Sequence, residues 1–238
     1  MSAFILVHGG FHGAWCWDGV ARALRAQGHY VHPIDLPGRA ESAHLKTSVT
    51  LDDYVATLAL AVASAPESPT LVAHSMGGVT VNQFAQANPS AINEIIYVSA
   101  ITPRDGESGT AVQLEIGHDS ALMTEGFLVI AEDFAVTEIT KTGAAEAFYH
   151  ACDDTDTDYA LSRLCPEPSR PLMTSLELGS DFQRVRKRYI ATKADRAVPL
   201  DFQLALASRM DATVEVIDAD HSPFYSARGQ LIALLDKR

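Results

Sequence analysis

The stretch "LVAHSMGGVT", residues 71–80, sets a serine between an apolar run and a run of helix-forming residues. Two interpretations of Ser75 are open. A serine at such a junction is a common helix N-cap, because its side-chain oxygen accepts a backbone N–H of the first helical turn. The stretch is also close to G-x-S-x-G, the tight strand-to-helix turn that exposes a nucleophilic serine above a β-sheet. That turn needs small neighbours, and Ala73, in place of the first glycine, and Gly77 are both small.

The pattern of a strand followed by a helix extends to both sides of this stretch. Short apolar runs alternate with longer stretches of helical periodicity, which is typical of a parallel sheet with crossover helices. The predicted strands are residues 4–8, 30–36, 70–74, 94–100, 187–193 and 212–219, and the predicted helices are residues 17–28, 51–65, 76–88, 200–209 and 223–236. The sequence therefore predicts an α/β fold with a mostly parallel central sheet flanked by helices.

This alternation is interrupted over residues 103–186. Apolar residues there are spaced as in short helices, and acidic loops separate them. Between Asp105 and Asp181 there are 16 acidic and 3 basic residues, a net charge of −13, and the rest of the chain sums to +1. We expect a core domain made of residues 1–102 and 187–238, with residues 103–186 inserted as a helical segment. A chain of 238 residues is long enough for one such domain.

Charge and hydropathy exclude several classes of partner. An acidic segment repels phosphate groups, so nucleic acid is not expected as a partner. No apolar run approaches the roughly 18 residues that suggest a membrane span, and the N-terminus carries no basic region of a signal peptide. Three cysteines without C-x-x-C spacing fit a reducing cytoplasm better than a disulfide framework or a zinc site. The oligomeric state is not determined, and a homodimer stays open.

No motif in the sequence predicts a metal or a cofactor. The run "DDTDTDY", residues 153–159, begins like a calcium-binding loop, but Tyr159 stands at the turn glycine and Cys165 at the bidentate glutamate. No G-x-x-x-x-G-K or G-x-G-x-x-G follows a predicted strand, so a nucleotide cofactor is not expected.

Residues that directly follow strands are the candidates for chemistry, because ligands bind beyond the carboxyl ends of an open parallel sheet. Ser75, Asp195 and His221 each follow a predicted strand. A serine nucleophile needs a base to take its proton and an acid to orient that base, and these residue types supply the three roles. Their agreement in type, chain order and position predicts a Ser75–His221–Asp195 catalytic triad.

The same chemistry needs two backbone N–H groups to stabilise an oxyanion. We expect the N–H of Met76, next to the nucleophile, and an N–H of the glycine-rich loop after the first strand, with Gly10 as first choice and Phe11 as fallback. Three other groups near these positions are assigned no catalytic role. The His74 side chain is expected to point away from Ser75, His12 to make a structural hydrogen bond, and Asp220 to shape the loop before His221.

The motifs "LVHGGFHGAWCW", "DLPG", "LVAHSMGG" and "YIATKADRAVP…FQ…ADH" resemble the α/β-hydrolase superfamily. The resemblance is to the branch of plant methylesterases and hydroxynitrile lyases with bacterial esterase relatives, and it is weakest over residues 103–186. It implies that this segment is a cap over the active site and that no cofactor or metal is needed. In the lyases of this branch, a threonine follows the first histidine and a lysine follows the catalytic histidine. Here Gly9 and Ser222 hold these positions.

The predicted function is that of a serine carboxylesterase that hydrolyses a small, uncharged, hydrophobic ester through an acyl-enzyme. An ester with an aromatic part is one option. Few cations and many apolar residues in the inserted segment favour such a substrate. A hydroxynitrile lyase or carbon–carbon bond hydrolase using the same triad is the first alternative. A non-catalytic receptor for a small ligand, built on the same fold, is the second, since fold does not fix function.

Overall fold

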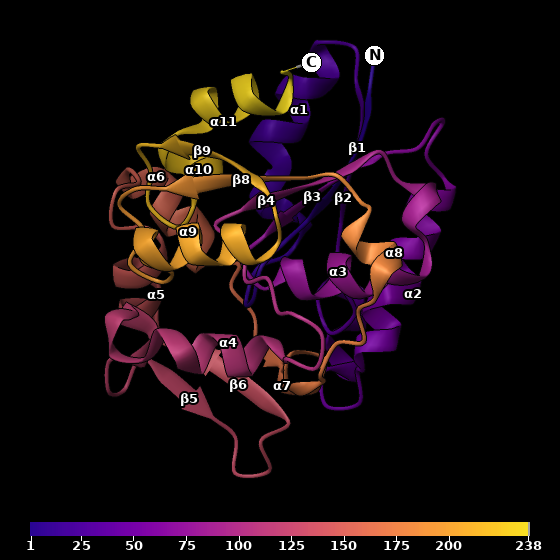
Figure 1. The fold of residues 1–238 in the computed structure, drawn as a ribbon. Helices are drawn as coiled ribbons and strands as arrows, with labels where there is room; N and C mark the ends of the chain where they lie inside the picture. Colours follow the sequence, from indigo (N-terminus) through magenta and orange to yellow (C-terminus); the bar gives the residue numbers. More distant parts are fainter. Residues whose placement is uncertain (238) are drawn as a thin grey trace.

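The computed structural model describes residues 1–237 and contains a central sheet of six parallel strands in the order β2-β1-β3-β4-β8-β9 (Figure 1). The strands are β1 Ala3–Val7, β2 Tyr30–Ile34, β3 Thr70–His74, β4 Glu94–Val98, β8 Lys187–Thr192 and β9 Thr213–Ile217. Strand β1 pairs with β2 on one side and with β3 on the other. The order in which the chain adds strands to the sheet therefore reverses between β1 and β3. Such a reversal opens a crevice at the carboxyl ends of the strands.

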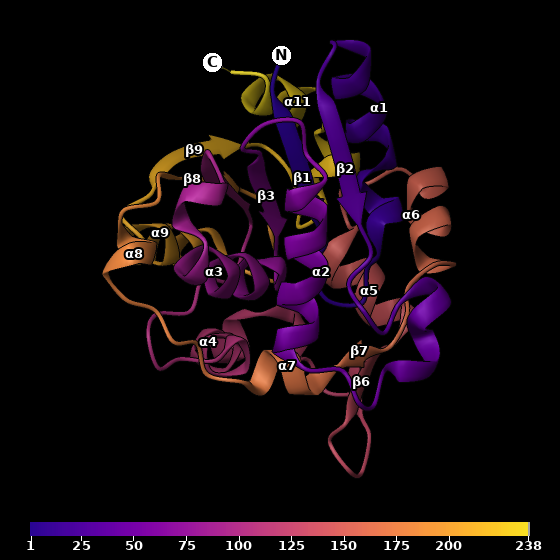
Figure 2. The ribbon, with the colours of Figure 1, turned by 90° about the vertical axis from the view of Figure 1, so that its right-hand side faces the viewer.

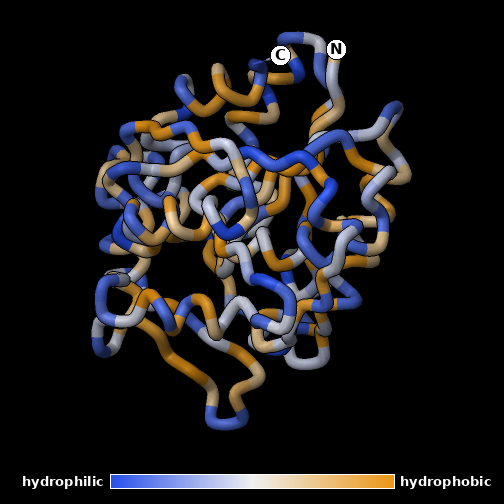
Figure 3. The backbone as a smooth tube through the Cα atoms, viewed as in Figure 1, coloured by the Kyte–Doolittle hydropathy of each residue, from blue (hydrophilic) through white to orange (hydrophobic). Residues whose placement is uncertain are grey.

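Each central strand is apolar on both faces because helices cover both faces of the sheet. In β1, Ile5 and Val7 join one apolar cluster, while Phe4 and Leu6 join the other. Successive side chains of a strand point to opposite faces, so a continuous apolar run supplies both clusters. Hydrophobic residues accordingly gather in the middle of the molecule (Figure 3).

The helices divide between the two faces, as the two views show (Figures 1 and 2). Residues of α2 Leu51–Ala63, α3 Gly77–Ala87 and α9 Leu200–Arg209 pack in one cluster, and residues of α1 Asp18–Ala26, α10 Pro223–Ser226 and α11 Arg228–Leu235 pack in the other. Short 3₁₀ turns occupy Ala14–Trp17, Ala40–Leu45, Pro89–Ala91, Gly117–Asp119 and Ala121–Met123. The α/β class predicted from the sequence is confirmed.

The single helix predicted for residues 223–236 is wrong, because the chain breaks between α10 and α11. Ala227 leaves the helical region with φ −141° and ψ 36°. The residue before it, Ser226, donates its hydroxyl to the Asp220 carboxylate at 2.7 Å. This bond ties α10 to the loop that carries His221.

Most regular elements of the inserted segment are helices, and it also contains a small antiparallel sheet that the prediction omitted. Its helices are α4 Gly109–Ile116, α5 Lys141–Phe148, α6 Asp154–Leu161, α7 Ser169–Met173 and α8 Ser180–Gln183, and its strands are β5 Leu128–Ile130, β6 Val136–Ile139 and β7 Glu167–Pro168. Strands of 2 to 4 residues are too short to show an alternating pattern. Phe134, with φ 56°, turns the chain between β5 and β6.

The two ends of the described chain come together near the amino-terminal ends of the parallel strands. The Ser2 N–H donates to His29 Nδ1 at 3.2 Å, and His29 Nε2 contacts the Asp236 carboxylate at 2.8 Å. Across residues 1–237, none of the helices combines the length and the apolar character that a membrane crossing requires.

Candidate active site

The structure brings Ser75, His221 and Asp195 together at the carboxyl ends of the parallel strands. The Ser75 hydroxyl lies 3.0 Å from His221 Nε2, and His221 Nδ1 lies 2.8 Å from Asp195 Oδ2. All three side chains are buried. Since a carboxylate only accepts, Nδ1 carries the ring proton and Nε2 is free to accept the proton of the serine hydroxyl.

Ser75 occupies a sharp turn between β3 and α3. Its φ of 49° is in the left-handed region, which a residue with a side chain adopts at a cost. The Ser75 carbonyl accepts hydrogen bonds from Ile101 N at 2.9 Å and from Gly78 N at 3.1 Å. A Cβ at Gly78 would lie 2.2 Å from the Ile101 oxygen, so only glycine permits this close approach.

The N-cap interpretation of Ser75 is wrong. Helix α3 begins at Gly77, its N-cap residue is Met76, and no side chain caps it. A capping serine has an extended backbone, whereas Ser75 is left-handed and turns its hydroxyl away from the helix toward His221.

Asp195 is held in one orientation by four donors besides the imidazole. Its Oδ1 accepts the N–H groups of Ala197 and Val198, both at 2.8 Å. Its Oδ2 accepts the Thr192 hydroxyl at 3.1 Å and the Gln203 amide at 3.3 Å. A carboxylate fixed in this way can hold the imidazole in one tautomer.

The groups assigned no catalytic role make hydrogen bonds to the backbone of neighbouring loops. His74 Nε2 donates to the backbone oxygen of His221 at 2.7 Å, so its ring supports the loop rather than the serine. His12 Nδ1 donates to the Gly10 oxygen at 2.7 Å. Burial lowers the pKa of His74 well below its ordinary value and that of His12 to about 3, so both rings are neutral. Asp220 accepts the N–H of Ser222 at 2.9 Å and shapes the turn.

The candidate oxyanion donors differ in their availability. Among the described residues, the N–H groups of Gly10 and Met76 make no hydrogen bond, so they are free to bind a ligand oxygen. The two residues are neighbours, since a Cβ at Gly10 would lie 3.6 Å from Met76 Cγ. The fallback donor, the N–H of Phe11, is already bonded to Glu167 Oε2 at 2.8 Å.

Gly9 has no room for a side chain. A Cβ there would lie 2.7 Å from Ser75 Cβ and 2.8 Å from His74 Nδ1. The threonine found at this position in hydroxynitrile lyases would therefore require the serine turn to move. Ser222, at the position of the lyase lysine, is fully buried and uncharged.

One aromatic ring from the inserted segment stacks on His221, and a second, from the loop after β1, lies beside the first. The Phe148 ring, at the end of α5, stacks on the imidazole with centroids 5.2 Å apart and planes at 29°. Phe11 lies 6.2 Å from Phe148. Both belong to an apolar cluster of Phe11, Ala144, Ala147, Phe148, Tyr149, Ala160 and Ala197.

Sequence reasoning missed three polar residues beside this site: Arg39, Tyr54 and Glu167. Arg39 is the last residue of "DLPGR", which follows the second strand. It could therefore have been found by the same criterion, that ligands bind beyond the carboxyl ends of the strands. Glu167 lies 128 residues away from Arg39 in the chain, and no local sequence pattern predicts their contact.

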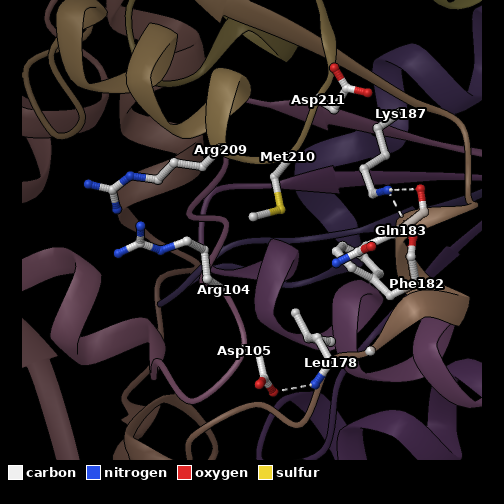
Figure 4. A pocket seen from close by; sticks show the side chains of 10 residues that line it. Arg104, Asp105, Leu178, Phe182, Gln183, Lys187, Arg209, Met210 and Asp211 are labelled. Carbon is white, nitrogen blue, oxygen red and sulfur yellow. Dashed lines mark hydrogen bonds between the residues drawn. The ribbon is translucent and has the colours of Figure 1, made fainter.

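A separate pocket of about 410 Å³ lies between α8, α9 and the start of β8 (Figure 4). None of the three predicted triad residues lines it. Its buried lysine, Lys187, already donates to the carbonyls of Phe182, Gln183 and Val185. Within residues 1–237, no group of three or more His, Cys, Asp or Glu side chains is placed to hold a metal ion.

The model of the alpha/beta hydrolase family matches residues 4–234. The chain belongs to this family. Relatives of this hydrolase include Methylesterase 7 of Arabidopsis thaliana and Esterase PIR7B of Oryza sativa subsp. japonica, each 30% identical over 98% of this chain and 94% of the relative. These names agree with the enzyme class predicted from the sequence, a carboxylic ester hydrolase.

Solved structures of the same fold cover nearly all of this hydrolase. A methylesterase protein from Arabidopsis is 25% identical, with a TM-score of 0.83 over 99% of this chain and 97% of that chain. Polyneuridine aldehyde esterase, at 23% identity, has a TM-score of 0.87 over 99% of this chain and 98% of that chain, which shows the fold alone.

Proposed function

We propose that this hydrolase is a serine carboxylesterase with Ser75 as nucleophile, His221 as general base and Asp195 as the acid that orients it. The observation that carries the proposal is the unbroken contact from the Ser75 hydroxyl to His221 and on to Asp195, at 3.0 and 2.8 Å, beside two unused N–H groups. The names of the relatives support ester hydrolysis.

The reaction proceeds in two stages. His221 Nε2 takes the Ser75 proton while the serine oxygen attacks the ester carbonyl, and the N–H groups of Gly10 and Met76 stabilise the oxyanion. The tetrahedral intermediate collapses to an acyl-enzyme as His221 gives the proton to the departing alcohol. A water molecule, deprotonated by His221, then attacks the acyl group and releases the acid.

The proposed substrate is a small, uncharged, hydrophobic ester, with an aromatic group on one side. Phe148 presents an apolar ring next to His221, and Phe11 lies next to Phe148. The buried cation near this site, Arg39, is paired with Glu167 and does not attract a charged substrate. Methyl esters are the first class to assay, because the relatives include methylesterases.

Cyanohydrin cleavage is disfavoured by the site. A departing cyanide needs a cation beside the catalytic histidine, and Ser222 supplies none. The crowding at Gly9 further separates this site from the lyases.

The decisive test is a panel of aryl and alkyl esters assayed with the wild type and with Ser75→Ala. We expect the substitution to lower kcat by at least about a thousandfold, since it removes the nucleophile. Mass spectrometry after treatment with an aryl phosphonate should find the adduct on Ser75 of the wild type. Ser120→Ala, a buried serine in the inserted segment, is the matched control.

Four outcomes would contradict the proposal. Undiminished turnover by Ser75→Ala, or an adduct on another residue, would refute the mechanism. Release of cyanide from mandelonitrile as fast as ester turnover would favour a lyase. Tight binding of an ester without turnover would favour a receptor.

A further inference from the structure

A buried carboxylate of the inserted segment lies against the loop that follows β1. Glu167 is 3% exposed, and its Oε2 accepts the Phe11 N–H at 2.8 Å. The same oxygen binds the Arg39 guanidinium, and Oε1 accepts the Tyr54 hydroxyl at 3.2 Å. Arg39, Tyr54 and Glu167 together form what we name the buried clasp.

The buried clasp and its neighbours fix the loop on both sides of Phe11. The Phe11 oxygen accepts Cys165 N at 3.0 Å, two residues before Glu167, and the His12 oxygen accepts Arg39 Nε at 3.1 Å. Phe11 has φ 64°, a left-handed conformation that costs about 1–3 kcal/mol in a residue with a side chain. These bonds hold that conformation and occupy the N–H of Phe11, whereas the N–H of Gly10 makes no hydrogen bond.

Charge within the buried clasp is balanced next to the proposed oxyanion site. A Cβ at Gly10 would lie 3.4 Å from Glu167 Oε2, so a carboxylate oxygen borders the place where negative charge develops. Although burial alone lowers the pKa of Arg39, the charge of Glu167 raises it above its ordinary value, so Arg39 stays cationic. Arg39 therefore offsets a charge that would otherwise repel the oxyanion.

We propose that Glu167 is a positioning residue, which aims the Gly10 N–H at the oxyanion by holding the Phe11 N–H, and that Arg39 neutralises it in that place. The inference rests on the proposed oxyanion role of Gly10. It also makes the inserted segment part of the catalytic apparatus, because Glu167 comes from β7 and the loop from the core.

The test compares four variants on the best ester of the panel. Glu167→Met removes the acceptor, and Glu167→Gln keeps an oxygen for the Phe11 N–H. Arg39→Met leaves the carboxylate without its cation, and Arg39→Met/Glu167→Gln removes both charges. Each variant is checked for folding by circular dichroism and thermal unfolding. Asp156→Asn is the matched control, because it breaks another ion pair of the inserted segment, with Arg228, away from the loop.

A misdirected oxyanion donor acts on the transition state more than on substrate binding. We expect Glu167→Met to lower kcat by about ten- to a hundredfold, with KM changed less than about threefold. The rate of phosphonylation of Ser75 should fall in parallel, and Glu167→Gln should recover most of both. Arg39→Met should lose more kcat than Glu167→Met, and adding Glu167→Gln should restore it. Asp156→Asn should match the wild type.

A second readout follows the loop itself. Hydrogen–deuterium exchange at the Phe11 amide should be slow in the wild type and in Glu167→Gln, and fast in Glu167→Met. Should Glu167→Met not fold, the comparison of Arg39→Met with Arg39→Met/Glu167→Gln decides the proposal in the same way.

The proposal is wrong if folded Glu167→Met keeps the wild-type kcat, or if its loss lies in KM alone. An inactive wild type that leaves Ser75 unlabelled would instead refute the proposed esterase. In that case, slow exchange at the Phe11 amide that depends on Glu167 would still support the role of the buried clasp in holding the loop. Exchange that is independent of Glu167 would refute that role.

Discussion

At the residue scale, the backbone around Ser75 is determined by atoms that touch it rather than by preferences of serine. Its left-handed conformation is kept because its carbonyl is bonded to Ile101 and its N–H to the Val98 oxygen at 3.2 Å. Glycine at 78 is what allows the Ile101 backbone to come so near. The strain at the nucleophile is therefore held by packing beneath it.

A methyl group at residue 78 is expected to disturb this packing. Gly78→Ala places Cβ 2.2 Å from a backbone oxygen, and overpacking of this kind costs about 1–3 kcal/mol. The measurement is the free energy of unfolding from urea denaturation, together with the rate of Ser75 phosphonylation, and we expect both to fall.

The control for this prediction is another helical glycine with free space around it. A Cβ at Gly229 in α11 would meet nothing within 4 Å, so Gly229→Ala should add about 0.5–1 kcal/mol by lowering the entropy of the unfolded chain. Equal urea midpoints for the two variants would contradict the account of Gly78.

At the scale of elements, helix α5 carries the aromatic contact to the proposed base. Its last residue, Phe148, is buried against His221 and Phe11. We expect Phe148→Leu to raise KM for aryl esters several-fold and to leave KM for small alkyl esters unchanged, because leucine keeps apolar volume but loses the flat ring surface. Steady-state kinetics on matched ester pairs measure the difference.

Phe134→Leu makes the same substitution elsewhere in the inserted segment. Phe134 is 64% exposed at the turn between β5 and β6, so no change in KM is expected. A loss shared equally by aryl and alkyl esters in Phe148→Leu would mean that the ring shapes the site without contacting the substrate.

The core elements were predictable from sequence because each carries its own local signal. The strand at residues 70–74 and the helix at residues 200–209 match the structure at both ends, since a buried apolar run and a periodic stripe end at turn residues. The meeting of Ser75, Asp195 and His221 followed from topology, because the carboxyl ends of parallel strands share one edge. Their catalytic roles stay a prediction.

The inserted segment resisted prediction because its structure depends on contacts remote in sequence. Strand β7 consists of Glu167 and Pro168 and exists only through pairing with β6. Glu167 owes its place to Arg39, 128 residues earlier. The break at Ala227 likewise lies beside a hydrogen bond between Ser226 and Asp220, which local propensities do not predict.

At the scale of the whole molecule, three buried histidines link folding to pH. Burial lowers the pKa of His8 and of His74 well below their ordinary value of 6.5, and that of His12 to about 3. Their hydrogen bonds fit neutral rings, since His12 Nδ1 donates to Gly10 O and Nε2 accepts the Tyr149 hydroxyl at 2.6 Å. Protonation would break this arrangement.

The free energy of unfolding is therefore expected to fall as pH drops from about 6.5 toward 3. Above pH 6.5 these rings are neutral in both states and cost nothing. Below it, the unfolded chain binds up to three protons that the folded chain excludes, and each costs up to about 1.4 kcal/mol per pH unit. Urea midpoints at closely spaced pH values between 4.5 and 7.5 measure the slope.

His12→Gln should flatten that slope even though it lowers stability overall, because one excluded proton is gone. His44→Gln, at an exposed position, serves as the control and should leave the slope as in the wild type. A slope that is the same in all three proteins would show that other groups govern the acid response.

The meeting of both chain ends at His29 has a practical consequence. Ser2 and Asp236 both contact His29, and the N and C ends lie near each other in Figure 1, whereas Ser75 and His221 follow the carboxyl ends of β3 and β9. A linker at either end would attach the protein to a solid support with the candidate site turned to the solution. The geometry thus suits oriented immobilisation, for example on an electrode or a bead for continuous-flow ester conversion.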